Sequence, residues 1–119
     1  MNKINLKEKF DLFDEQWTPK IVAELNDSYV KLGKIEGAFT WHKHDMEDEM
    51  FYVVKGTMHM NFRDKVVEMK EGEMIVVPMG VEHMPSCDEE VHIMMIEKKT
   101  TLNTGDVVNE KTKSEWEWI

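Results

Sequence analysis

The sequence predicts an all-β protein, a sandwich or barrel with one short helix near its N-terminus. Residues 21–96 divide into short runs rich in β-branched and aromatic residues, with turn residues between them. Several runs alternate apolar and polar side chains, and residues 57–62 place Met58, Met60 and Phe62 on one face of a strand. The length of 119 residues fits one domain with one hydrophobic core.

The entry segment, residues 1–20, precedes the strands. Asn5 is suited to cap a helix that continues to about Phe13, with Phe10 and Phe13 on its apolar face. Pro19 ends this segment, and the period of the apolar pattern changes after it.

The barrel is expected over residues 21–100. Within the long run 29–44, we expect Gly33 and Gly37 to form bulges or bends. The acidic residues 88–90 predict the turn of a last hairpin. The expected strands are 21–25, 29–44, 49–54, 57–62, 66–69, 74–77, 84–87 and 91–96.

The C-terminal tail, residues 101–119, is polar until its last four residues. Trp116, Trp118 and Ile119 are unusually apolar for a chain end. The tail is therefore expected to pack on the barrel or on a partner subunit.

The charge of the chain argues against some partners. Its 24 acidic and 15 basic residues give a net charge of −9, and Arg63 is the one arginine. Nucleic acids and anionic membranes attract clustered lysine and arginine, so we expect neither as a partner. The first residues lack the apolar run of a signal peptide, and Cys87 has no second cysteine to pair with. We interpret the protein as cytoplasmic.

Two segments carry residues suited to metal binding. His42 and His44 are two positions apart, so on a strand they would point to the same face, and Glu49 begins the next strand. In the second segment, a turn containing Pro78 and Gly80 precedes His83 and would aim that side chain.

Three imidazoles and one carboxylate suit a divalent transition metal, namely Fe, Mn, Ni, Co or Zn. In an octahedral shell they leave two positions open for water, substrate or O₂. The alternative is a barrel that keeps these four residues without a metal. We expect one metal ion to be held by His42, His44, Glu49 and His83.

The two segments resemble the two motifs of the cupin superfamily. The first is similar to G-x5-H-x-H-x(3,4)-E-x6-G, with one residue fewer between Gly37 and His42. The second is similar to G-x5-P-x-G-x2-H-x3-N, with Cys87 in place of the asparagine. The match covers about residues 21–96 and is closest to the small single-domain "cupin 2, conserved barrel" proteins, loosely called mannose-6-phosphate isomerase-like. It implies a cupin jelly-roll barrel that forms a homodimer and uses the same four residues as metal ligands.

A small-molecule pocket is expected beside the metal, with an apolar lining. The residues expected to line it have the same inward strand phase as the metal ligands, and Cys87 among them is interpreted as a buried thiol. The expected lining is Phe51, Val53, Met58, Met60 and Cys87.

A general base is not evident from the sequence. Glu36 has a suitable phase and Glu82 adjoins His83, so these two are the candidates. His59 and His92 alternate with apolar residues, and we expect both to face the surface and not to bind the metal.

The outer face of the sheet is expected to carry Phe39 and Trp41, which have the opposite phase to the first two histidines. They would pack against a second subunit or against the N-terminal helix. Of the cations near the site, Lys34 is expected to point inward, Lys43 outward, and Arg63 to lie in a turn. One inward cation gives little support for a phosphosugar substrate.

Two classes of function fit these features. The first is a small metalloenzyme, of oxygenase or isomerase/epimerase type, that acts on a small molecule in the barrel pocket. The second is a non-catalytic protein that binds a metal or small metabolite as a sensor or accessory subunit.

Overall fold

The computed structural model describes residues 1–113 and 115–119 and is mostly β-structure with one short helix, as predicted. The helix, α1 (Leu6–Phe10), is capped by Asn5, whose side chain accepts a hydrogen bond of 3.0 Å from the Glu8 amide. A cap of this kind stabilises a helix by about 1 kcal/mol. The helix ends at Phe10, earlier than expected, although Phe13 in the next turn is also buried.

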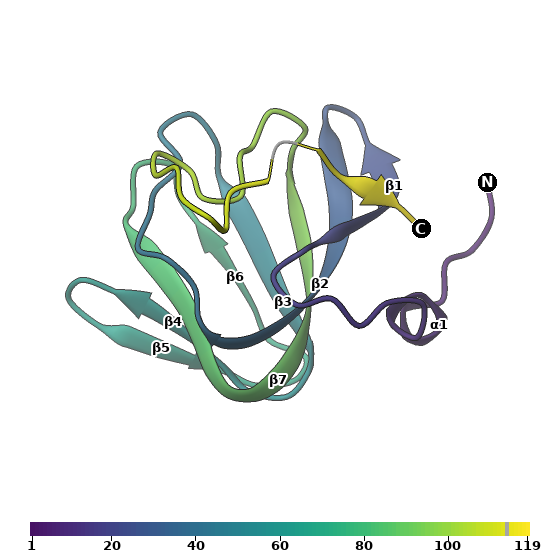
Figure 1. Ribbon diagram of the computed structural model, residues 1–119, viewed down its shortest axis with the longest axis horizontal. Helices are drawn as coiled ribbons and strands as arrows, with labels where there is room; N and C mark the ends of the chain where they lie inside the picture. Colours follow the sequence, from purple (N-terminus) through teal and green to yellow (C-terminus); the bar gives the residue numbers. More distant parts are fainter. Residues whose placement is uncertain (114) are drawn as a thin grey trace.

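The strands form one sheet that curves around a core (Figure 1). Its main path runs β5-β4-β7-β2-β1-β8, and β3 pairs with both β6 and β7. The strands are β1 (Lys20–Leu25), β2 (Ser28–Ala38), β3 (Glu49–Lys55), β4 (Met58–Phe62), β5 (Val66–Met69), β6 (Met74–Val77), β7 (His83–Lys98) and β8 (Glu117–Trp118).

The expected last hairpin is wrong, because its two strands are one continuous strand, β7. The first part of β7 pairs with β4 and the last part with β3, while β2 runs beside both parts. Residues 88–90 stand opposite the single residue Glu36 and form a bulge, not a turn. Exposed acidic residues are compatible with both a hairpin turn and a bulge, and only the pairing with β2 shows which of the two is formed. Figure 1 shows β7 bending around the lower end of the sheet.

The bulge expected at Gly37 is confirmed. The register of β2 against β7 shifts between Ile35 and Gly37, and Gly37 has a φ of +80°. Gly33, in contrast, pairs in regular register with Ile93 and forms no bulge. The run predicted over 29–44 is also too long, since β2 ends at Ala38.

Two apolar clusters fill the molecule. The larger lies inside the curved sheet and includes Phe51, Val53 and Met60. The smaller joins α1 to the outside of β1 and β2 through Phe10 and Leu32, and Ile119 packs against it.

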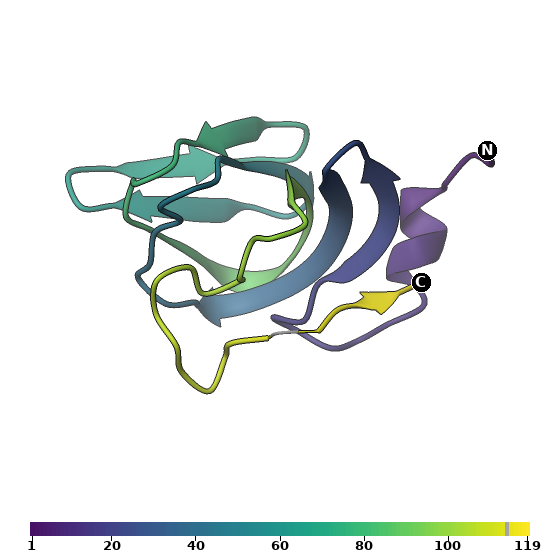
Figure 2. The same cartoon turned by 90° about the horizontal axis from the view of Figure 1, so that it is seen from above.

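The C-terminal tail packs on the same chain. In Figure 2 it crosses one end of the sheet before β8 pairs in parallel with β1. Trp118 meets Tyr29 edge to face at 5.7 Å. No helix in the described part of the chain is long and apolar enough to cross a membrane.

Candidate metal centre

The loop after β2 meets the first residues of β3 and β7 at the candidate site. His42 and His83 form an isolated β-bridge, with reciprocal backbone hydrogen bonds of 3.1 and 2.9 Å. The strand argument for His42 and His44 is wrong, because both lie beyond the end of β2. Their rings are nevertheless adjacent, with centroids 5.0 Å apart, because the bridge holds the loop in an extended conformation.

The four expected ligands are brought together. One ligand atom from each of them lies within 4.8 Å of the other three. All four side chains are buried, none more than 4% exposed. This cluster of His42, His44, Glu49 and His83 could hold one metal ion.

Two of the histidines are fixed by backbone carbonyls. The Nδ1 of His42 lies 2.7 Å from the Thr40 carbonyl oxygen, and the Nδ1 of His83 lies 2.9 Å from that of Val81. A carbonyl oxygen only accepts, so each Nδ1 must donate a proton. In the neutral ring, Nε2 is then an unprotonated atom with a lone pair, as a metal ligand requires.

Three buried atoms of the cluster, His44 Nε2, Glu49 Oε1 and His83 Nε2, lack hydrogen-bond partners. Glu49 Oε1 lies 3.2 Å from His44 Nε2 and 3.4 Å from His83 Nε2, yet neither contact has hydrogen-bond geometry. Buried polar atoms are normally satisfied, and one metal ion among these three atoms would satisfy all of them. The residues therefore fit a divalent transition metal.

The surroundings favour the metal-binding protonation state of His42 and Glu49. Burial and the neighbouring His83 lower the pKa of His42 to about 4, so its ring is neutral at pH 7. Burial opposes ionisation of Glu49, but contacts with Glu97, His44 and His83 outweigh burial and hold its pKa well below the usual range. Burial also opposes a charged ring at His44, but the nearby Glu49 carboxylate outweighs burial and raises the pKa of His44, so a metal ion would have to displace a proton there. Neutral imidazole and ionised carboxylate are the ligating forms.

A mostly apolar cavity opens beside the cluster. Its empty space is about 500 Å³ when the open solvent at its mouth is included. His42 and Glu49 form part of its wall, so a molecule in the cavity would reach the ligand atoms. The apolar wall includes Trp17, Ile35, Phe39, Phe51, Ile93 and Met95.

The expected pocket lining is only partly found at the cavity. Phe51 lines it, as predicted. The other four candidates are buried in the large apolar cluster instead of the cavity wall, because the curve of the sheet places them farther from the opening; they are Val53, Met58, Met60 and Cys87. Cys87 is a buried thiol, as interpreted.

Phe39 lines the cavity, although the alternation of side chains predicted it on the outer face of the sheet. It stacks on Trp17 at 4.8 Å and meets the His42 ring edge to face at 5.4 Å. Its expected outward direction assumed a regular strand through residue 44, and β2 ends before it. The Arg63 guanidinium lies over the Trp41 ring, 3.9 Å from the ring centre.

The candidate bases are not brought to the cluster. Glu36 and Glu82 are both exposed; Gln16 contacts Glu36, and Glu82 pairs with Arg63. An alternating strand phase does not continue through the β2 bulge, which explains the misplacement of Glu36.

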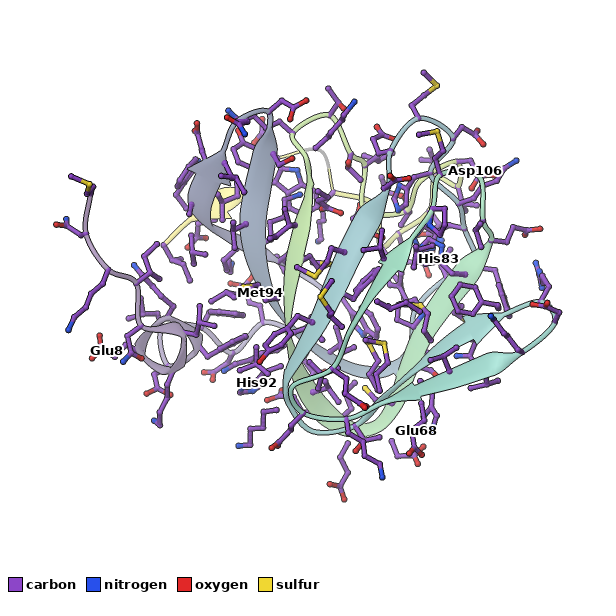
Figure 3. The ribbon with its side chains drawn as sticks, turned by 180° about the vertical axis from the view of Figure 1, so that it is seen from behind. Glu8, Glu68, His83, His92, Met94 and Asp106 are labelled. Atoms are coloured by element: carbon purple, nitrogen blue, oxygen red, sulfur yellow. The ribbon has the colours of Figure 1, made fainter. Side chains whose placement is uncertain are left out.

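Lys34 lines the cavity, as expected from its phase, but its amine donates to the Phe13 carbonyl. Lys43 pairs with Asp45 outside the cavity. His59 contacts Glu68 and His92 contacts Glu90, and neither histidine joins the cluster. Figure 3 shows His83 and His92 far apart along the curve of β7.

Glu97 is the cavity residue that the sequence analysis missed. It lines the cavity, is buried, and accepts a hydrogen bond of 2.8 Å from Lys31. Burial and the adjacent Glu49 raise the pKa of Glu97 well above its usual value. Its inward phase with Ile93 and Met95 was visible in the sequence, but a glutamate at the end of a strand reads as a surface residue.

The tail also supports the histidine loop. Asp106 accepts a hydrogen bond of 3.0 Å from the Lys43 amide through its side chain and donates its own amide to the Lys43 carbonyl. Figure 3 shows Asp106 near the same end of the molecule as His83. Gly105 packs so tightly there that an added Cβ would lie 2.1 Å from the Lys43 carbonyl oxygen.

Fold and site together define a curved β-sheet protein with a buried His₃Glu cluster of the metal-binding type. The chain belongs to the cupin family, since the sequence profile of the Cupin_2 cupin domain matches residues 28–97.

Two solved structures resemble the whole barrel. A cupin-2 domain containing protein from Shewanella frigidimarina is 48% identical, with a TM-score of 0.80 over 81% of this chain and 94% of that one. Protein NMB1881 from Neisseria meningitidis is 32% identical, with a TM-score of 0.75 over 82% of this chain and all of that one. These likenesses confirm the predicted cupin fold.

Two curated relatives match about half of this chain. The uncharacterised protein YdbB of Bacillus subtilis is 33% identical over 63 residues, which are 52% of this chain and 56% of that protein. Acireductone dioxygenase of Branchiostoma floridae is 35% identical over 65 residues, 50% of this chain and 36% of that protein. The match therefore spans little more than half of one relative and about a third of the other.

Proposed function

We propose that this protein is a metal-dependent dioxygenase acting on a small, mostly apolar molecule. The observation that carries the proposal is the cluster of three imidazoles and one carboxylate in the wall of an apolar cavity. A divalent transition metal held there would supply Lewis acidity and, with iron or manganese, redox chemistry with O₂. The similarity to a protein named acireductone dioxygenase supports this reaction class.

The chain's own residues have defined tasks. The backbone carbonyls of Thr40 and Val81 orient His42 and His83, so their Nε2 atoms face the site. Phe39 contacts the His42 ring edge to face and Trp17 stacks on Phe39, so these two rings make this end of the cavity apolar.

The cavity indicates the substrate's character. Among the described residues that line it, Lys34 is the single cation, and its amine is already bonded to the Phe13 carbonyl. A phosphosugar needs several free cations, so the wall favours an uncharged or weakly polar substrate. The two carboxylates named as candidate bases, Glu36 and Glu82, lie outside the cavity, whereas Glu97 lines it.

Oxygen uptake by the metal-loaded protein tests the proposal. The metal-free chain is loaded with Fe, Mn, Co, Ni or Zn, and O₂ consumption is followed with an acireductone and other small enediols or hydroxyketones. Substrate-dependent uptake that is lost in His44→Ala supports a dioxygenase. Stoichiometric metal with ligand binding but no uptake or turnover for any metal favours the non-catalytic binding protein.

A further inference from the structure

Trp17 lines the cavity with its backbone in an unusual conformation. Its φ is +56°, a left-handed value that is rare for a bulky residue. Such a conformation costs free energy and persists only where the surrounding structure fixes the residue. The amide of Trp17 donates to the Lys34 carbonyl at 2.9 Å, and its indole Nε1 donates to the Glu36 carbonyl at 3.0 Å.

The turn at this position does not itself require a tryptophan. A glycine adopts a left-handed φ without a steric penalty and would keep the amide hydrogen bond. What tryptophan adds is its ring. Because Trp17 is only half-buried, the ring packs on the edge of the larger apolar cluster and stays between the cavity and the solvent.

The ring forms a stack that reaches the metal-binding cluster. Trp17 and Phe39 lie 4.8 Å apart with 15° between their planes, and Phe39 meets the His42 ring edge to face at 5.4 Å. Only about 40 Å³ of the cavity is accessible to the centre of a water-sized sphere, which is room for a few waters. A larger molecule that reaches the cluster must therefore displace side chains of the wall.

The C-terminal tail adds a contact to this stack. The Lys111 amine donates to the Ala38 carbonyl at 3.0 Å and lies 5.9 and 5.8 Å from the ring centres of Trp17 and Phe39. A cation near the face of an aromatic ring is attracted to it. Trp17 is thus held by the backbone of β2, by Phe39 and by the tail.

We propose that Trp17 determines the substrate specificity of this site by limiting the size of the molecule that reaches the metal. The substrate would be a compact metal-chelating molecule, such as a short enediol, and not a fused-ring compound. This inference deepens the proposed function and rests on its metal site, but not on the reaction with O₂.

Two hydroxamates with the same metal-binding group test the size limit. Acetohydroxamate is compact, and 2-naphthohydroxamate carries a fused ring. The full chain is loaded with Co²⁺, and the Kd of each hydroxamate is read from the visible Co²⁺ spectrum. We expect wild type to favour acetohydroxamate. Trp17→Gly should lower the ratio of the naphthohydroxamate Kd to the acetohydroxamate Kd by about tenfold or more, because the ring no longer blocks the larger molecule.

Trp118→Gly is the matched control. Trp118 is half exposed and contacts Tyr29 outside the cavity, so its loss should leave the Kd ratio unchanged. Trp17→Phe keeps a smaller ring and should lower the ratio less than glycine does, which provides the comparison if Trp17→Gly does not fold. Trp17→Ala removes the same ring as Trp17→Gly but should unfold at a lower temperature, because alanine resists a φ of +56°.

An unchanged Kd ratio in the folded Trp17 variants would overturn the size limit. An alanine variant more stable than the glycine variant would overturn the strained conformation. Failure of the proposed function looks different. Wild type that binds no Co²⁺ removes the metal site and the specificity role with it. A changed Kd ratio without O₂ uptake on any substrate overturns the oxygenase and leaves the role of Trp17 in place.

Discussion

The ring nitrogen that carries the proton in His42 and in His83 is set by the backbone carbonyl two residues before each histidine. Each ring donates its Nδ1 proton to that carbonyl, Thr40 for one and Val81 for the other. The same local geometry therefore appears twice, once in the loop after β2 and once in the first residue of β7. Both rings present Nε2 to the cluster before any ion binds, which lowers the cost of assembling a metal site.

Cys87 offers a test at the residue scale. Burial raises the pKa of this thiol to about 11, and the Sγ donates to the Ile35 carbonyl at 3.4 Å. We expect iodoacetamide at pH 8 to leave the native protein unmodified and to alkylate it fully in denaturant, as mass spectrometry would show. Rapid alkylation of the folded protein would contradict the buried thiol.

The same thiol predicts a pH dependence of stability. The pKa of Cys87 in the folded protein is higher than its ordinary value of 9.0. The stabilising effect of the protonated thiol is therefore complete below pH 9 and is lost as the pH rises towards 11. Unfolding midpoints from pH 8 to 11 should therefore fall more steeply for wild type than for Cys87→Ala. Parallel curves would show that the thiol does not contribute.

At the scale of elements, the C-terminal tail contacts the loop between β2 and β3. Gly105 has a φ of +56° and approaches the Lys43 carbonyl, while Asp106 bonds to both the amide and the carbonyl group of Lys43. The tail therefore supports the loop that carries His42 and His44. No motif marks this contact, because the two segments are distant in sequence.

Gly105→Ala should separate the tail from the histidine loop. We expect it to destabilise the protein by about 2 kcal/mol or more and to weaken Co²⁺ binding, because the new Cβ displaces the loop. Gly72→Ala is a matched control, since Gly72 has a φ of +85° with open space around its Cβ position. That control should cost about 1 kcal/mol and leave Co²⁺ affinity unchanged. Denaturant unfolding and Co²⁺ titration would measure both, and equal affinities would contradict the supporting role.

Metal binding should stabilise the whole molecule. The cluster joins the loop after β2 with β3 and β7, so an ion held there links distant parts of the chain. Co²⁺ at 100 times its Kd should add about 2.7 kcal/mol to the free energy of unfolding. Calorimetry should show a higher Tm that a chelator reverses, and Glu49→Gln should lose most of this gain. An unchanged Tm for wild type would argue against a metal site.

The homodimer stays a prediction at this scale. Among the described residues, β6 pairs with β3 alone, and its Met74 and Val76 are exposed. An apolar edge strand suits pairing with a second copy. Light scattering after gel filtration should show a dimer that Val76→Lys converts to monomer, while Val108→Lys in the tail has no effect. A monomeric wild type would contradict the prediction.

The sequence by itself determined the strand-rich fold and the identity of the four cluster residues. Those features are local: turn residues such as Pro78 and Gly80 act on their neighbours, and ligand chemistry belongs to the side chain. The tertiary structure decided which residues share the cavity. Bulges and strand ends change the phase of alternation, so Phe39 turned inward and Glu36 outward. The continuous β7 and the position of Glu97 opposite Glu49 depend on pairing between distant strands, which no local pattern encodes.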